Sequence, residues 1–257
     1  QLSIMRRCHT FFEKYWQNMM KKNVIRVPQG CPTVEKAMEL AVVFSERKVY
    51  TETDPLKIQL DHGVHKVVGY FQRIHRKSVH RKSVKVTCSH ITFVGKGKDH
   101  TTVRGGFRVE NQQNVKIEEL TLTNPGGDGL YLTGSETNVD VLKCSVKECE
   151  GSGMHVDDGA TVTATQCDFV ENGGWGVFCD YLNTKARLND CTVHHNGSDG
   201  LNACSYAVMD LHGTKTDIHS NKGCGIFADY FGKVNIHLPS QHNTSHDNVQ
   251  EDRHQEE

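Results

Sequence analysis

The chain has 257 residues, a formal net charge of −1 and 24% charged residues. This balance disfavours a protein that binds nucleic acid through its overall charge, and no apolar run approaches the about 20 residues of a membrane-spanning helix. A polar chain with 23 glycines and only 5 prolines is typical of repetitive β architectures with many turns.

The first 22 residues mix charged and apolar side chains and lack the pattern of a secretory signal. We expect residues 1–22 to be a helical segment that carries Phe11, Phe12, Tyr15 and Trp16. Two interpretations stay open. The segment is either the end of an upstream domain, since it is loosely similar to the end of an F-box, or a helix packed on the domain that follows.

A strand is expected at residues 24–27, and a helix follows at 33–47. Thr33 is suited to cap the helix N-terminus. One face of this helix is apolar and carries Val34, Ala37, Met38, Ala41 and Val42. We expect the helix to cover the N-terminal end of the repeat described below, because the open end of a solenoid would expose its core and its backbone groups.

A dense basic stretch occupies residues 72–85, where the pentapeptide His75–Val79 is repeated as His80–Val84. It is predicted to be an insertion loop between two strands. One interpretation is a loop that binds an anionic partner or is phosphorylated at Ser78 or Ser83, and the other is a solvated loop without a specific role. The basic residues are Arg73, Arg76, Lys77, Arg81, Lys82 and Lys85.

An internal repeat of 23–25 residues runs through the rest of the chain. A glycine followed by two apolar residues in alternation recurs in every repeat, and cysteine and asparagine columns keep the same spacing. Each repeat contains three short alternating runs, which predict strands stacked directly on the next repeat. The columns consist of Gly129, Gly153, Gly176, Gly200 and Gly225; of Cys144, Cys167 and Cys191; and of Asn124, Cys149, Asn172, Asn196 and Asn221.

This pattern resembles the parallel β-helix repeat of the pectate-lyase-like superfamily over residues 84–248. The resemblance implies an all-β, right-handed, single-stranded parallel β-helix over residues 23–248, with an N-terminal helical cap. The superfamily includes lyases, hydrolases, epimerases, phage tailspikes and non-catalytic eukaryotic adaptors. This sequence is closest in style to the non-catalytic eukaryotic proteins, but the fold alone does not fix the function.

The three columns are expected to be structural. The cysteines should point inward as small apolar residues, and the asparagines should satisfy backbone groups at a turn. We expect free thiols in a reducing compartment, no bound metal, because no C-x2-C pair is present, and no cofactor. The acidic tail at residues 249–257 is predicted to be disordered.

Alternation places a second set of side chains on the outer face of the first strand in each repeat. Aromatic rings beside carboxylates suit both sugar binding and a protein interface, and a polar surface with incidental aromatics stays the plain alternative. This candidate binding face consists of Tyr131, His155, Phe178, Asn202, Phe227, Asp157, Asp180, Asp229, Tyr181 and Tyr230.

Catalysis by this face is the weaker hypothesis. Asp157 and Asp180 should lie about 5 Å apart on adjacent coils, as a glycosidic acid pair requires, and His155 could act as a base. However, the Gly-His-Gly and Asp-Pro-His motifs of polygalacturonases and alginate epimerases are absent. We therefore expect an intracellular, cytoplasmic binding or scaffold module for a protein or polysaccharide. The alternative is a carbohydrate-active enzyme, namely a lyase, hydrolase or uronate epimerase.

Overall fold

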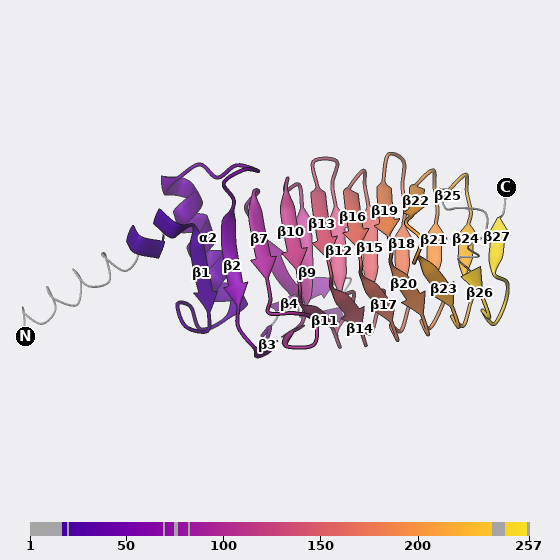
Figure 1. Ribbon diagram of the computed structural model, residues 1–257, viewed down its shortest axis with the longest axis horizontal. Coiled ribbons are helices and arrows are strands. Elements are labelled where there is room, and N and C mark those ends of the chain that lie inside the picture. The colour runs from indigo at the N-terminus through magenta and orange to yellow at the C-terminus, as the bar shows by residue number, and fades with distance from the viewer. Residues whose placement is uncertain are drawn as a thin grey trace, which may run out of the picture.

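The computed structural model describes residues 17–19, 21–68, 70–74, 77–81, 83–237 and 245–255, and side chains between residues 69 and 82 lie outside this description. The chain winds into an elongated solenoid whose coils follow one another from the N-terminal to the C-terminal end (Figure 1). Three parallel sheets run along its length. The predicted all-β parallel β-helix is therefore confirmed.

Each of the three sheets takes one strand from nearly every coil. The first sheet contains β1 (Val24–Val27), β2 (Leu56–Leu60), β7 (Ile91–Val94), β10 (Val115–Glu118), β13 (Asn138–Leu142), β16 (Thr161–Thr165), β19 (Lys185–Asn189), β22 (Val208–His212) and β25 (Lys233–Ile236). The second contains β3 (Gly63–Lys66), β8 (Thr101–Arg104), β11 (Thr121–Thr123), β14 (Ser145–Lys147), β17 (Asp168–Val170), β20 (Thr192–His194), β23 (Asp217–His219) and β26 (Ser245–His246). The third contains β6 (Ser83–Val86), β9 (Gly106–Glu110), β12 (Leu130–Thr133), β15 (Met154–Asp157), β18 (Val177–Cys179), β21 (Leu201–Ala203), β24 (Ile226–Ala228) and β27 (Arg253–Gln255).

Helix α2 (Val34–Arg47) lies at the N-terminal end and packs against β1, β2 and β6. The Thr33 side chain accepts a hydrogen bond from the backbone N–H of Lys36, as the sequence predicted for an N-cap. Phe44 is fully buried, whereas Val42, which we expected on the buried face, is only half-buried. The helix therefore presents a slightly different stripe to the solenoid than its sequence suggested. Residues 17–19 and 21–22 are also helical.

The glycine column exists because adjacent coils approach closely at the start of each third-sheet strand. A Cβ atom at Gly176 would lie 2.3 Å from a methyl group of Val193 and 2.6 Å from the carbonyl oxygen of Gly200. Neither neighbour has room to move, because one is core side chain and the other is backbone of the next coil. The glycines are therefore needed for coil stacking.

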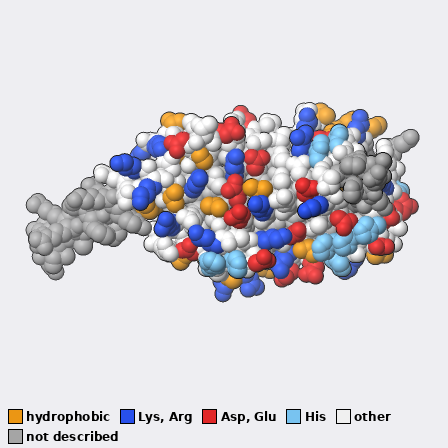
Figure 2. Space-filling view, in the orientation of Figure 1, with side chains coloured by type: hydrophobic (Ala, Val, Ile, Leu, Met, Phe, Trp, Pro, Cys, Tyr) orange, Lys and Arg blue, Asp and Glu red, His pale blue; other side chains and the backbone are white. Residues whose placement is uncertain are grey.

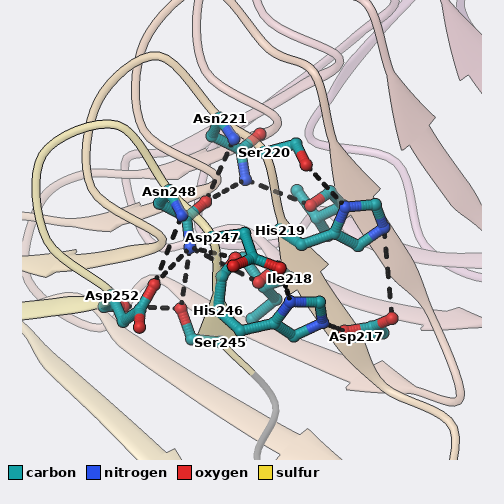
Figure 3. Close-up of polar contacts among 11 residues, drawn as sticks. Asp217, Ile218, His219, Ser220, Asn221, Ser245, His246, Asp247, Asn248 and Asp252 are labelled. Atoms are coloured by element: carbon teal, nitrogen blue, oxygen red, sulfur yellow. Dashed lines mark hydrogen bonds and ion pairs between the residues drawn. The ribbon is translucent and has the colours of Figure 1, made fainter.

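The asparagine column forms a continuous hydrogen-bonded ladder inside a turn. The Nδ2 of Asn172 donates to Oδ1 of Asn196 at 3.0 Å, and Asn196 donates in the same way to Asn221 at 2.9 Å. Figure 3 shows the last step, in which both the backbone N–H and Nδ2 of Asn221 donate to Oδ1 of Asn248. The ladder thus satisfies buried backbone and amide groups, and it extends one coil beyond the predicted column.

The cysteine column also lies inside, where Cys144, Cys167 and Cys191 are fully buried. Nine described cysteines are free thiols. Burial raises the pKa of Cys149 to about 12 and that of Cys179 above its usual range. Cys149 and Cys179 therefore stay protonated at neutral pH, and the inward cysteines act as small apolar core residues.

Two segments differ from the sequence-based expectations. The stretch expected to be a basic loop contains an antiparallel hairpin of β4 (Tyr70–Ile74) and β5 (Lys77–Arg81), followed directly by β6. The tail expected to be disordered contributes β27, which pairs in parallel with β24. The tail forms a further strand because its backbone groups pair with those of β24 in the preceding coil, and this pairing does not require apolar side chains.

Candidate functional site

A single outward-facing column of side chains crosses all eight strands of the third sheet. Each member is the register partner of the next across a parallel strand pair, so the column rises by one strand spacing, about 4.8 Å, per coil. Its members in order are Lys85, Arg108, Tyr131, His155, Phe178, Asn202, Phe227 and His254.

The rings of this column contact one another from coil to coil. The Arg108 guanidinium lies over the Tyr131 ring at 4.7 Å from its centroid, and the Tyr131 and His155 rings meet edge to face at 5.0 Å. His155 lies 4.8 Å from Phe178, and Phe178 stacks on Trp175 at 4.5 Å with an interplanar angle of 21°. These contacts hold the rings as one half-buried surface.

A cluster of ionisable groups surrounds His155. Its Nδ1 lies 3.8 Å from a carboxylate oxygen of Asp128, and its Nε2 lies 3.9 Å from Oδ2 of Asp157. The Tyr131 hydroxyl donates a hydrogen bond to the same Asp157 oxygen at 2.9 Å. Burial, reinforced by the Asp157 carboxylate, raises the pKa of Tyr131, so the phenol stays a hydrogen-bond donor at neutral pH. The other Asp157 oxygen is buried and has no hydrogen-bond partner in the part of the chain that the structure describes.

Asp199 organises the next part of the face. One of its oxygens accepts hydrogen bonds from Nε1 of Trp175 at 3.1 Å and from Nδ2 of Asn202 at 3.0 Å. The other accepts from the backbone N–H of Cys224 at 2.7 Å. The carboxylate therefore fixes the indole ring next to Phe178 and draws the Asn202 amide against the surface.

Comparison with known proteins identifies the family. A family model described as a right-handed β-helix region matches residues 78–249, which is about two thirds of the chain. The chain belongs to the right-handed β-helix family. This match and the three parallel sheets confirm the resemblance inferred from the repeat.

Solved structures that share features of this β-helix differ widely in sequence. The mannuronan C-5 epimerase AlgE6 A-module of Azotobacter vinelandii is 12% identical, with 79% of each chain covered and a TM-score of 0.35. The ORF18 protein of Geobacillus virus E2 is 12% identical over 86% of this chain and 61% of that protein, with a TM-score of 0.41. The pectin methylesterase PemA of Erwinia chrysanthemi is 12% identical over 78% and 69%, with a TM-score of 0.44.

The β-helix brings some predicted site residues together and separates others. Tyr131, His155 and Asp157 form one cluster, and Phe178 extends it. Asp157 and Asp180 lie on adjacent coils, at the ends of the register-paired strands β15 and β18, and their expected role as an acid pair stays a prediction. Asp180 accepts a hydrogen bond from the backbone N–H of Tyr181 at 2.8 Å, because it lies where the strand enters the turn.

Two predicted aromatics lie off the sheet face. Tyr181 and Tyr230 are 59% and 64% exposed at the turns between the third and first sheets, and both have positive φ angles. Asp229 begins the second of these turns. Tyr206 lies in the equivalent turn of the coil between them. Its ring stacks on that of Phe231, the residue after Tyr230, with centroids 5.0 Å apart. These side chains form a separate exposed cluster rather than part of the column.

Four residues of the site were missed from the sequence, namely Arg108, Asp128, Trp175 and Asp199. Three of them, Asp128, Trp175 and Asp199, directly precede a glycine of the regularly spaced glycine column. A usable signal was present, because the tripeptide Asp-Gly-Leu occurs at residues 128–130 and again at 199–201. Asp128, Trp175 and Asp199 are half-buried at this position, whereas Ser152 and Cys224 at the same position in other coils are buried.

The basic stretch stays a prediction. Arg76 and Lys82 lie outside the described residues, and the side chains of Arg73, Lys77 and Arg81 are not described either. Lys85 is exposed and begins the outward column of the third sheet. Among the residues that the structure describes, no group of three or more His, Cys, Asp or Glu side chains could hold a metal ion, and no helix is long and apolar enough to cross a membrane.

Proposed function

We propose that the outer face of the third sheet binds a glycan chain. The observation that carries this proposal is the uninterrupted column of rings from Tyr131 to Phe178, extended by Trp175 and flanked by carboxylates. Rings stack on the apolar faces of pyranoses, and carboxylate and amide oxygens accept hydrogen bonds from hydroxyl groups. The face therefore offers both kinds of contact that a sugar needs.

The shape of the face favours an extended ligand. One outward residue per coil, at about 4.8 Å per step, gives a surface that repeats along the solenoid axis. A linear polysaccharide also repeats along its axis, at a similar length per sugar. The rings are half-buried and held by ring contacts and by the Asp199 hydrogen bond, so little side-chain entropy is lost when a ligand lies on them.

Isothermal titration calorimetry of the whole chain against a panel of linear oligosaccharides tests this function. Phe178→Ala should weaken binding by about fivefold to tenfold, since a stacked ring contributes about 0.5–1.5 kcal/mol beyond its buried area. The matched control is Thr163→Ala, which removes an outward side chain at the same level of the first sheet. Equal affinities for the two variants, or no binding of any oligosaccharide, would contradict glycan binding by this face.

The His155 cluster favours a second candidate, a polysaccharide-processing enzyme. An imidazole between two carboxylates, with a phenol bonded to one of them, is a set of groups able to donate and accept protons. In this case His155→Ala should abolish product formation even at saturating glycan, a loss that weaker binding alone does not cause. Chromatography of the glycan after incubation detects the products. A glycan that binds and is recovered intact would leave the chain as a binding module, expected to be intracellular.

A further inference from the structure

The charge on the proposed binding face is strongly one-sided. There is no lysine or arginine in strands β12, β15, β18, β21 and β24. The same is true of the residue before the glycine that precedes each strand, and of the first residue of the turn that follows it. Five half-buried carboxylates occupy this same area. They belong to Asp128, Asp157, Asp180, Asp199 and Asp229.

The hydrogen-bond donors to these carboxylates are neutral groups, and the imidazole of His155 lies 3.8 Å from Asp128 and 3.9 Å from Asp157. Asp128 accepts from the backbone N–H of Ser152 at 2.7 Å, Asp157 accepts from the Tyr131 hydroxyl, and Asp180 accepts from the backbone of its own turn. Hydrogen bonds of this kind orient a carboxylate without cancelling its charge. Within the described parts of the chain, none of the five forms an ion pair with a lysine or arginine.

Cations border this area at both ends, with Arg253 on β27 as the register partner of Ile226 in β24, and with Arg108 and Lys85 at the N-terminal border. Arg108 is already engaged by Glu110 at 3.3 Å and by the Tyr131 ring, and Lys85 lies one coil further away. A ligand that covers β12 to β24 therefore meets an excess of negative charge and aromatic rings. A polyuronate would be repelled over most of its length, whereas an ammonium group would be attracted by both carboxylates and ring faces.

We propose that the ligand of this face is a cationic glycan, an amino-sugar polymer with free ammonium groups. The proposal rests on the glycan-binding function above and narrows it to a chemical class. Each sugar lies over the ring column, and its ammonium group points to a carboxylate on either side, as Asp157 and Asp199 are placed. A lysine-rich peptide would carry the same charge, but its side chains do not offer flat faces that repeat with the coils.

Calorimetry with defined hexasaccharides tests this class. The probes are a hexamer of glucosamine, its fully N-acetylated form, a hexamer of galacturonic acid, and hexalysine, all at a mildly acidic pH that keeps the sugar amines protonated. The glucosamine hexamer should bind about tenfold more tightly than the acetylated form at low salt, and this difference should shrink at high salt because the attraction is screened.

Charge-neutralising variants separate electrostatic selectivity from stacking. The double variant Asp180→Asn with Asp229→Asn should lower the affinity for the glucosamine hexamer by about fivefold and leave that for the acetylated form unchanged. Asp140→Asn, an outward carboxylate of the first sheet, is the matched control and should change neither affinity.

The outcomes distinguish the two proposals. Equal affinity for glucosamine and its acetylated form, or a preference for the galacturonate hexamer, would overturn the cationic class while glycan binding stands. Binding of hexalysine with no binding of any saccharide would overturn both, and would identify a basic peptide as the partner.

Discussion

The outer faces of the first and third sheets share one scaffold but carry different chemistry. In the first sheet the corresponding outward column contains Lys57, Thr92, Lys116, Asp140, Thr163, Arg187, Asp210 and Asn235. It has no aromatic residue, and opposite charges neighbour each other, as Lys116 and Asp140 do at 3.7 Å. Such a column is typical of a solvated surface, and the ring-rich column of the third sheet departs from it.

The inward residues of the two sheets do not show this difference. Val139 and Val162 of the first sheet are as well buried as Leu132 and Val156 of the third. Stacking requires apolar inward side chains in every sheet, but it places no demand on the outward ones beyond solubility. The rings and carboxylates on the outer face of the third sheet are therefore not a requirement of coil stacking.

The comparison depends on coils that stack in strict register, so the largest expected effect comes from breaking the stack. Asn196→Ala should lower the free energy of unfolding by about 3 kcal/mol, because it removes the buried amide that accepts from the backbone N–H and Nδ2 of Asn172 and donates to Phe169 O and Asn221 Oδ1. Urea denaturation followed by circular dichroism measures this.

The matched control is Asn138→Ala. Asn138 is an exposed asparagine of the first sheet whose amide bonds only to the Thr161 hydroxyl. Its loss should change stability by less than about 0.5 kcal/mol. If the two substitutions had similar effects, the ladder would not be what keeps the coils in register.

The second prediction concerns the third-sheet face itself. Tyr131→Phe removes the hydroxyl that donates to Asp157, whose other oxygen has no hydrogen-bond partner among the described residues. We expect a loss of about 1.5–3 kcal/mol, typical of a hydrogen bond to a charged group. Tyr206→Phe, at an exposed turn, should have almost no effect. Urea denaturation of both variants would show whether the third-sheet column is an internally bonded surface, and equal midpoints would argue that it is not.

Sequence alone was sufficient for the features that depend on backbone stacking. The glycine and asparagine columns follow from the constant length of the repeat. The repeat also fixes which side chains point inward, because a shift of the strand register by one residue would turn every inward side chain outward. Asn202 shows the limit of that logic, since its position is outward as predicted but its side chain is only 8% exposed. Its burial depends on the Asp199 hydrogen bond, which no spacing rule contains.

Side-chain direction at strand ends was likewise beyond the sequence. Asp157 and Asp180 occupy equivalent positions, yet one turns to Tyr131 and the other to its own turn, because the turns that follow them differ in length and composition. The hairpin of β4 and β5 was missed because the duplicated basic pentapeptide has no apolar alternation. Strand β27 was missed for a similar reason, because its sequence is polar and has no apolar alternation.

The outward column of the second sheet extends the comparison to a third surface. His194, His219 and His246 stack as nearly parallel rings, 4.8 and 5.2 Å apart between successive centroids. Histidines gather near the C-terminal end in Figure 2, and Figure 3 shows His246 between Asp217 and Asp247. The two ends of this stack thus lie in different electrostatic environments.

The last prediction is that these two ends titrate in opposite directions. Burial, helped by the neighbouring His219 and His195, lowers the pKa of His194 below its usual value, whereas the Asp247 hydrogen bond and Asp217 raise that of His246. The stability linked to neutral His194 is therefore present above the unfolded-state pKa, near about 6.5, and is lost as the pH falls through its lowered folded-state pKa. The stability linked to charged His246 is present below that unfolded value and is lost as the pH rises through its raised folded-state pKa.

Imidazole resonances followed by NMR across this range should show His246 titrating at a higher pH than His194. Asp247→Asn should move the His246 midpoint down and leave the His194 midpoint in place, because Asp247 contacts only the C-terminal ring of the stack. If both midpoints moved together, the stacked rings would titrate as one coupled unit. The side chains of the second-sheet column would then behave as a coupled set. In this they would be like the contacting rings of the third-sheet face and unlike the solvated side chains of the first-sheet column.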